Sequence, residues 1–362
     1  RYATSSVRAN AEQERELINM TNYAPFDTRP NFEATESDIS VALLTDHLNT
    51  TKSKLAKQIG KRGVMEVLGD MQLLVGPPEQ LCISNAALMM FCEHLDKFFP
   101  YTQVEITKFP EGSIKNPNNF IEVPVIKGSV PTMIKRTMEK LQDMVIEEKV
   151  TKVDYQMEAI RRYSYPYQAL EEAVVNAFYH RDYQSYQAII IEIEPDCVRI
   201  ISYPGIDRSI SQKTIAEGER FKSRYYRNKR LGEFLKELDL TEGKSTGIPT
   251  IQEELRDNGS PKATFETDDE RRAVTVEIPI HPDFLMEQGE PQNEPQNEPQ
   301  NAKSVEDAIL QLIRMNKYVT REEMASQIEV SLSTVKRSIN KLKTSGIIEY
   351  EGPSKGGYWS IK

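Results

Sequence analysis

Cysteine and histidine are scarce in this chain of 362 residues, which has three Cys and four His. The cysteines, Cys82, Cys92 and Cys197, lie far apart and form no Cys-x-x-Cys pair. A structural zinc site needs closely spaced Cys and His ligands, and a secreted disulfide scaffold needs paired cysteines, so both classes are excluded. Scattered thiols favour a reducing compartment, and we expect a cytoplasmic protein.

Two further features are missing. No apolar run approaches the roughly 18 residues that a membrane span requires, so we expect no membrane partner. Gly243-Lys244-Ser245 resembles the end of a phosphate-binding P-loop, but Leu238 stands where that motif requires a glycine. Without a Walker A loop the chain has no helicase motor.

Charge is unevenly distributed along the chain. The whole chain carries a net charge of −9, which excludes a protein that binds nucleic acid over its entire surface. Residues 303–362 hold 10 Lys/Arg and 7 Asp/Glu, so this segment is +3 and the remainder is −12. The contrast predicts a local nucleic-acid surface at the C-terminal end.

The pattern of residues 303–362 is typical of a winged helix-turn-helix domain. Thr320 and Glu323 have the spacing of a capping box, which predicts the start of the second helix. The third helix follows, with one apolar stripe formed by Leu332, Val335, Ile339 and Leu342. Two short apolar segments, 347–350 and 358–361, then flank a glycine-rich turn and predict the wing.

We expect the third helix to be the recognition helix for double-stranded DNA. Ser333, Thr334 and Arg337 lie near its N-terminal half, where base edges are reached. The rest of the predicted DNA surface is Lys336, Asn340, Lys341, Lys343 and, at the tip of the wing, Lys355. The four lysines are better placed for phosphates. The alternative is that this domain docks proteins or dimerises.

A repeat separates this domain from the rest of the chain. The unit Glu-Pro-Gln-Asn occurs three times, starting at Glu290, Glu294 and Glu298. It offers no aromatic or β-branched residue to bury, and its prolines lack a backbone donor. We therefore predict an extended linker at 287–302.

The segment before the linker is predicted to be an α/β core. Four β-branched segments indicate strands at 104–109, 188–194, 198–203 and 273–280. Apolar residues at three- and four-residue spacing indicate helices at 131–148, 167–179, 228–238 and 245–258. The fold class is α+β multidomain, with an α/β sandwich core followed by the winged helix-turn-helix.

One predicted helix carries a pair of residues with chemical potential. Glu172 and Asn176 are four apart and share a helix face. A carboxylate and an amide so placed could activate a water and hold Mg²⁺ beside a triphosphate. The alternative is a solvated helix edge.

An ordered set of motifs surrounds this pair. The stretch from Glu172 to Tyr183 reads Glu-x-x-x-Asn-Ala-x-x-His-Arg-Asp-Tyr, with Tyr203-Pro204-Gly205 and Thr246-Gly247-Ile248 beyond it. Together with Ser84-Asn-Ala-Ala-Leu-Met-Met-Phe91, this order resembles the bacterial family known as "ATP-dependent DNA helicase RecG-related" or as transcriptional regulators.

The resemblance implies an AlbA-like domain of the Schlafen type, a divergent GHKL ATPase-like domain and a C-terminal winged helix. It divides the chain into 1–32 (AlbA-like tail), 33–130 (helical and mixed), 131–286 (GHKL-like), 287–302 (linker) and 303–362 (winged helix).

The resemblance also assigns residue roles. Glu172 becomes the general base and Asn176 the Mg²⁺ ligand, while Gly205 and Gly247 fall in the ATP-binding boxes. The chain departs from the family at Tyr203, where a true ATPase has an adenine-binding aspartate, and in the scarcity of glycine around Gly247.

These departures favour a DNA-binding transcriptional regulator with a non-catalytic core. We expect that core either to dimerise, which would give a homo-oligomer, or to sense a ligand. The alternative is a Mg-ATP-dependent ATPase that gates DNA binding. A third hypothesis, by analogy with other Schlafen-related domains, is a phage-defence or interaction protein.

Overall fold

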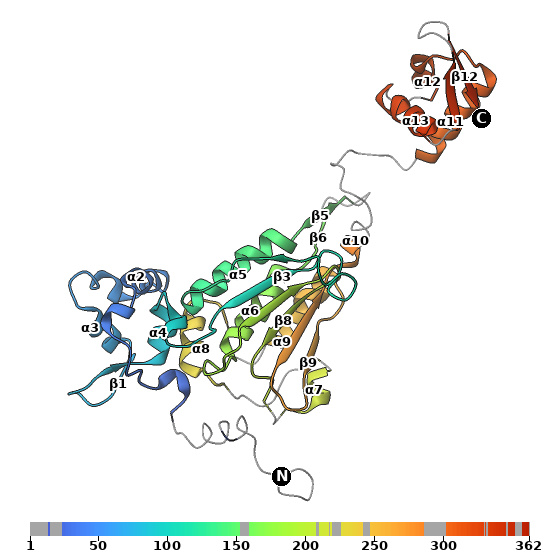
Figure 1. Cartoon of the computed structure of the whole chain (residues 1–362). Helices are drawn as coiled ribbons and strands as arrows, with labels where there is room; N and C mark the ends of the chain where they lie inside the picture. Colours follow the sequence, from blue (N-terminus) through green and yellow to red (C-terminus); the bar gives the residue numbers. More distant parts are fainter. Residues whose placement is uncertain are drawn as a thin grey trace, which may run out of the picture. The chain divides into compact units, whose positions relative to one another are not determined.

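A computed structural model of the chain forms two compact units, residues 1–290 and 291–362 (Figure 1). Each unit has a hydrophobic core of its own. The structure describes residues 14, 24–152, 159–207, 210–216, 218, 226–241, 247–285, 302–328, 330, 332–344, 347–351 and 357–361. Apart from Ala302, the predicted linker lies outside these residues, and so does most of the predicted AlbA-like tail.

The first unit is built on a mixed six-stranded sheet with the order β4-β3-β7-β8-β10-β9. Its strands are β3 (Val104–Lys108), β4 (Ile121–Glu122), β7 (Ile189–Ile193), β8 (Cys197–Ser202), β9 (Thr264–Thr267) and β10 (Val274–Pro279). Strands β3 and β7 are parallel, and the other neighbouring pairs are antiparallel. On β7, Ile189, Ile191 and Ile193 are buried. Alternation along the strand turns these three side chains to one face.

Three helices pack beside this sheet: α5 (Val130–Val145), α6 (Tyr167–Tyr179) and α9 (Gly247–Asn258) (Figure 1). Helix α6 contacts both α5 and α9, and it also contacts β8. Helix α5 begins at a cap, because Ser129 Oγ accepts the Thr132 amide at 3.4 Å and Pro131 occupies the first turn. The mixed α+β class expected from the sequence is confirmed.

Residues 24–100 form a mainly helical region of the first unit. Its elements are η1 (Phe26–Thr28), η2 (Glu36–Asp38), α2 (Val41–Thr50), η3 (Lys54–Lys57), α3 (Val64–Asp70), α4 (Asn85–Phe91), η4 (Leu95–Lys97) and the hairpin of β1 (Leu74–Val75) and β2 (Cys82–Ile83). Helix α8 (Lys229–Glu237) joins this region, and the buried carboxylate of Asp27 accepts the Leu231 amide at 3.0 Å. That hydrogen bond satisfies a donor in the first turn of α8.

Some predicted boundaries differ from the structure. The helix expected over 131–148 ends at Val145, because Glu148 starts β5 (Glu148–Thr151), which pairs with β6 (Ile160–Tyr163). The sequence pattern did not reveal β9, which pairs with β10. The short helices α7 (Gln212–Ala216) and α10 (Pro282–Leu285) complete the unit. No helix in the described part of the chain is long and apolar enough to cross a membrane.

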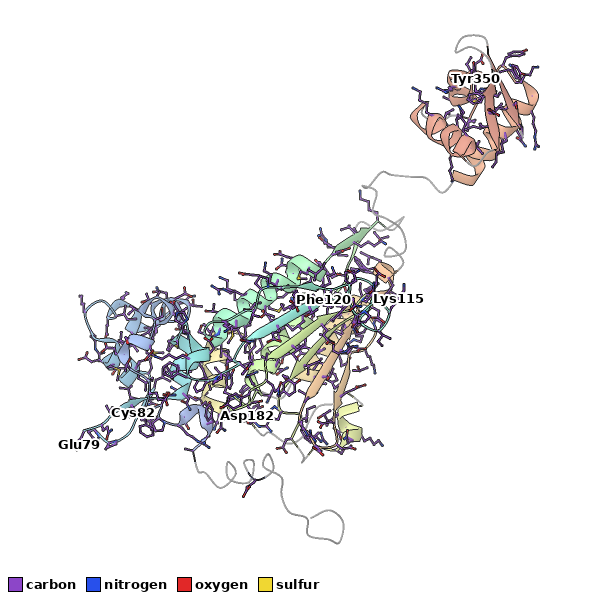
Figure 2. The ribbon with its side chains drawn as sticks, viewed as in Figure 1. Glu79, Cys82, Lys115, Phe120, Asp182 and Tyr350 are labelled. Carbon is purple, nitrogen blue, oxygen red and sulfur yellow. The ribbon has the colours of Figure 1, made fainter. Side chains whose placement is uncertain are left out.

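The second unit contains three helices followed by a hairpin. The helices are α11 (Ala302–Met315), α12 (Arg321–Ile328) and α13 (Leu332–Thr344), and the hairpin pairs β11 (Ile348–Glu351) with β12 (Tyr358–Ile361). Its core includes Ile309, Ile313, Met324 and Ile339. Trp359 from β12 belongs to this core. The ring of Tyr350 (Figure 2) packs edge-on against the Trp359 ring, with the two centroids 4.8 Å apart.

Candidate functional site

Helix α13 has one buried face and one basic face. Val335, Ile339 and Leu342 are buried in the core of the second unit, as the apolar stripe predicted. The side chains of the other predicted contact residues divide into two groups. Lys336, Lys341 and Lys343 are exposed. The backbone of Ser333, Thr334, Arg337 and Asn340 is helical, but their side chains lie outside the described residues, as does the whole of Lys355.

The elements around α13 are fixed by specific hydrogen bonds. The predicted capping box is confirmed: Glu323 Oε2 accepts the Thr320 amide at 2.8 Å, and Thr320 Oγ1 accepts the Glu323 amide at 3.2 Å. The hydrogen bond from the Thr320 backbone lowers the pKa of Glu323, so its carboxylate is charged at neutral pH. Trp359 Nε1 donates to the Val319 carbonyl at 3.0 Å and ties the hairpin to the start of α12.

Two basic side chains lie near the indole of Trp359. Arg321 Cζ, from the start of α12, and Lys343 Nζ, from the end of α13, each lie 5.9 Å from a Trp359 ring centroid. A cation over an indole face is electrostatically favoured. Arg321 is not among the DNA-contact residues predicted from the sequence. Arg321 precedes Glu322 and Glu323 and belongs to α12, not to α13, so the sequence did not indicate that it lies near Trp359.

In the first unit, the structure brings together three of the four predicted nucleotide-site residues. Asn176 Nδ2 donates to Glu172 Oε1 at 3.0 Å, one turn apart on α6. Gly247 opens α9 directly beside them, so that a Cβ added there would lie 2.5 Å from Glu172 Oε1 and 2.6 Å from Asn176 Nδ2. Only glycine allows α9 to approach this closely.

The fourth residue, Gly205, contacts a different part of the unit. Its amide donates to the Arg271 carbonyl at 2.9 Å, and an added Cβ would lie 2.7 Å from the Ala273 carbonyl oxygen. The Tyr203 carbonyl accepts the amide of Asp182 at 3.0 Å; Asp182 follows the C-terminal end of α6 (Figure 2). The backbone groups of this turn are therefore engaged by the chain itself.

The His-Arg-Asp sequence that follows α6 serves packing. The His180 ring stacks on Tyr179 and Tyr226, with centroids 4.9 and 5.9 Å away. Burial, assisted by the charge of Arg227, lowers the pKa of His180 to about 4, so the ring is neutral at pH 7. Arg181 is buried and donates to the Tyr101 carbonyl at 2.9 Å.

The residues present do not fit a bound nucleotide well. Tyr203 offers no carboxylate for an adenine amino group, and the amide of Gly205 is already bonded. The amide nitrogen of Asn176 already donates to Glu172. Among the residues that the structure describes, no group of three His, Cys, Asp or Glu side chains is arranged to hold a metal ion.

Comparisons with known proteins agree with this two-part organisation. Residues 187–277 match the family described as "Putative ATP-dependent DNA helicase recG C-terminal", and residues 305–358 match the family described as "HTH domain". The RecG-related match includes Gly205 and Gly247 but begins after Glu172 and Asn176. The helix-turn-helix match indicates DNA binding by the second unit.

Among solved structures, the chain is similar to the DIP2311 protein from Corynebacterium diphtheriae, with a TM-score of 0.54 at 16% identity. The similarity covers 96% of this chain but 66% of that one, and at this identity it concerns the fold alone. No curated protein sequence matches the chain. The resemblance to RecG-related proteins and the helix-turn-helix assignment are thus confirmed, whereas no match supports the AlbA-like tail, which stays a prediction.

Proposed function

We propose that this chain is a DNA-binding transcriptional regulator. The second unit would read duplex DNA through α13, and the first unit would be a non-catalytic, GHKL-like platform for dimerisation or ligand sensing. The observation that carries the proposal is α13 itself, whose apolar face is buried while Lys336, Lys341 and Lys343 are exposed. No acidic residue interrupts residues 331–345.

The roles on α13 follow from helix geometry. A recognition helix contacts base edges with its N-terminal residues, so Ser333, Thr334 and Arg337 are the proposed base readers. Lys341 and Lys343 lie in the last turn, where phosphates are the better partners. Arg321 would add a further phosphate contact, because it and Lys343 each lie 5.9 Å from a Trp359 ring centroid.

Selection of bound fragments from sheared genomic DNA tests base reading. We expect the full chain to enrich a defined sequence, and Arg337→Ala to lose that preference at a cost of roughly 1–3 kcal/mol on the preferred site. Lys355→Ala is the matched basic control and should weaken all sequences alike. If both variants lose affinity by the same factor on preferred and random DNA, Arg337 does not read bases.

A GHKL-like assignment of the first unit is supported by its two-layer arrangement of α5, α6 and α9 beside a mixed sheet. It is also supported by the position of Gly247 beside Glu172 and Asn176. The occupied turn at Tyr203–Gly205 argues against adenine binding, and so against nucleotide turnover, because a base without a positioned substrate has little to accelerate.

One observation favours the alternative, a Mg-ATP-dependent ATPase that gates DNA binding. The N-terminus of α9 lies beside Glu172 and Asn176, and helix N-termini attract phosphates. A phosphate-release assay on the full chain with Mg-ATP, with and without duplex DNA, separates the two. Activity above background that Glu172→Ala abolishes would favour the ATPase, and we expect none.

A further inference from the structure

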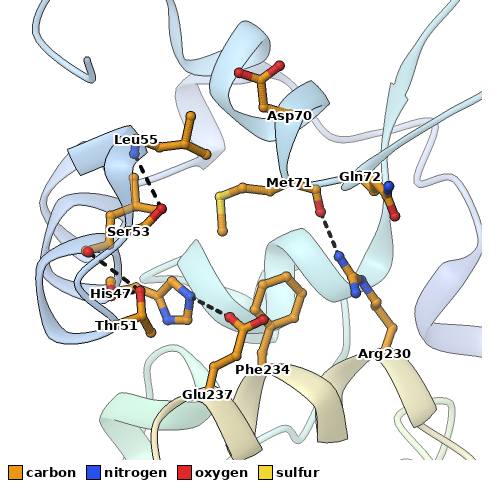
Figure 3. A pocket seen from close by; sticks show the side chains of 11 residues that line it. His47, Thr51, Ser53, Leu55, Asp70, Met71, Gln72, Arg230, Phe234 and Glu237 are labelled. Atoms are coloured by element: carbon orange, nitrogen blue, oxygen red, sulfur yellow. Dashed lines mark hydrogen bonds and ion pairs between the residues drawn. The ribbon is translucent and has the colours of Figure 1, made fainter. Parts of the chain in front are cut away.

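A cavity of about 480 Å³ lies in the first unit, and no residue of α6 or α9 lines it. Side chains from α2, from the segment around η3, from the end of α3 and from α8 line it (Figure 3). Its volume lies within the range of small-molecule sites, about 300–1,000 Å³. None of its lining residues belongs to the predicted nucleotide or DNA sites.

The lining of the cavity is mixed: polar and charged side chains are in the majority, and the apolar ones are Leu48, Leu55, Met71 and Phe234. Leu48 and Phe234 are almost fully buried, so Leu55 and Met71 present most of the apolar surface. These side chains provide a surface for an apolar ligand body, in contrast to the charged groups at the margin.

A buried histidine faces a carboxylate at this cavity. His47 from α2 and Glu237 from α8 point toward each other, with Nε2 3.4 Å from Oε2 (Figure 3). The side chain of His47 is 4% exposed, and burial lowers its pKa, so the ring is neutral at pH 7. Because Nε2 faces a carboxylate it carries the proton, and Nδ1 is left as an acceptor. That nitrogen has no hydrogen-bond partner among the described residues.

The positive charges around the cavity are already committed. Arg230 donates to the Met71 carbonyl at 2.6 Å and to Glu233 at 2.5 Å. Arg62 lies 2.5 Å from Asp70 and 2.9 Å from Glu66, so its charge is shared between these two carboxylates. Among the contacts of the described residues Glu237 has no lysine or arginine partner, and its side chain is 51% exposed, so the margin of the cavity presents a carboxylate that a ligand can reach.

We propose that this cavity binds a small organic cation, an ammonium or amidinium group on an apolar body. The cationic group would bind the Glu237 carboxylate, and the apolar body would lie against Met71 and Leu55. A charged hydrogen bond of this kind is about twice as strong as a neutral one. The site does not depend on the proposed DNA-binding role, because it lies wholly within the first unit.

Three indole compounds of similar size and different charge test the proposal: tryptamine, a cation; tryptophol, which is neutral; and indole-3-acetate, an anion. Titration calorimetry of the full chain at pH 7 should show saturable binding of tryptamine, with at least tenfold weaker binding of the other two. Equal binding of all three, or no tryptamine binding at millimolar concentration, would overturn the proposal.

Two variants locate the site. Glu237→Gln keeps the acceptor for His47 but removes the charge, and it should weaken tryptamine binding at least tenfold. Leu55→Trp should fill the cavity and abolish binding while leaving Glu237 intact. The matched control is Glu139→Gln, which removes one exposed charge from α5 and should leave affinity unchanged. Wild-type affinity in both site variants, each shown to be folded by circular dichroism, would place tryptamine elsewhere and refute the assignment.

Discussion

Replacement of Gly232 by alanine should destabilise the first unit although alanine favours helices. Gly232 lies inside α8, where Gly→Ala alone would gain about 1 kcal/mol. In this structure an added Cβ would lie closer than 3.0 Å to three atoms of the Tyr179 side chain, two ring carbons and the hydroxyl oxygen, whereas non-bonded carbon atoms prefer about 3.5–4.0 Å. Tyr179 is 5% exposed, and Tyr226 stacks on it at 5.2 Å. The ring therefore has little room to move away.

Gly69→Ala is the matched control, because Gly69 is also helical but the nearest atom to an added Cβ is Leu74 Cδ1 at 3.7 Å. Overpacking costs about 1–3 kcal/mol, and the number of close atoms places Gly232 at the upper end. The two variants should thus differ by about 3 kcal/mol, which corresponds to about 5 °C in melting temperature for a unit that spans residues 1–290.

Far-UV circular dichroism measures this difference, and tryptophan fluorescence supplies an internal reference. Trp359, the single tryptophan of the chain, lies in the second unit, so its fluorescence transition should not change in either variant. If Gly232→Ala melts at or above the temperature of Gly69→Ala, the close packing of α8 on α6 is wrong.

Four further predictions concern the second unit, the linker and the core. Thr320→Ala removes the cap of α12 and should lower the free energy of unfolding of the second unit by about 1 kcal/mol. The thermal transition followed by Trp359 fluorescence should then occur at a lower temperature, and an unchanged transition would refute the capping box. The pKa of Glu323 is lowered in the folded state, so its charge stabilises the second unit above the ordinary pKa of glutamate, and this stabilisation is lost as the pH falls through the folded pKa. Glu323→Gln should therefore destabilise the second unit at pH 7 and have a smaller effect at pH 3.5. Deletion of one Glu-Pro-Gln-Asn unit should leave DNA affinity unchanged, since a coil-like linker imposes no fixed geometry, and a large loss in a gel-shift titration would mean that the repeat packs against the protein. In a thermal-shift titration, Mg-ATP should not raise the melting temperature of the first unit, and a saturable rise would favour the ATPase alternative.

Periodicity predicted the elements with strong local patterns. The apolar stripe of α13 and the capping box at Thr320 depend on residues within one or two turns of each other, so the sequence contained them. The end of α5 was missed because residues 146–148 have no helix breaker. Pairing of Glu148 with Tyr163 on β6 decides that boundary, and this contact is distant in sequence.

In the candidate sites, too, contacts between residues close in sequence were predictable and contacts between distant residues were not. Glu172 and Asn176 share a turn of α6, and their contact was predictable from spacing. The approach of Gly247 to this pair depends on the packing of α9 against α6, and the cavity depends on His47 and Glu237, which are 190 positions apart. Pairs of this kind give no periodic signal, so only the fold reveals them.

The salt dependence of binding to duplex DNA tests the central claim most directly. The full chain is compared with a triple variant, Lys336→Ala, Lys341→Ala and Lys343→Ala, and with a control of equal charge change on the first unit, Lys115→Ala, Lys135→Ala and Lys140→Ala, all of which replace exposed lysines. Each phosphate contact contributes about 0.9 to the slope of log affinity against log salt concentration. Fluorescence anisotropy should give a steep slope for the wild type and the control, and a slope shallower by up to about 2.7 for the α13 variant. Equal slopes for the two variants, or no binding by the wild type at low salt, would contradict DNA binding through α13.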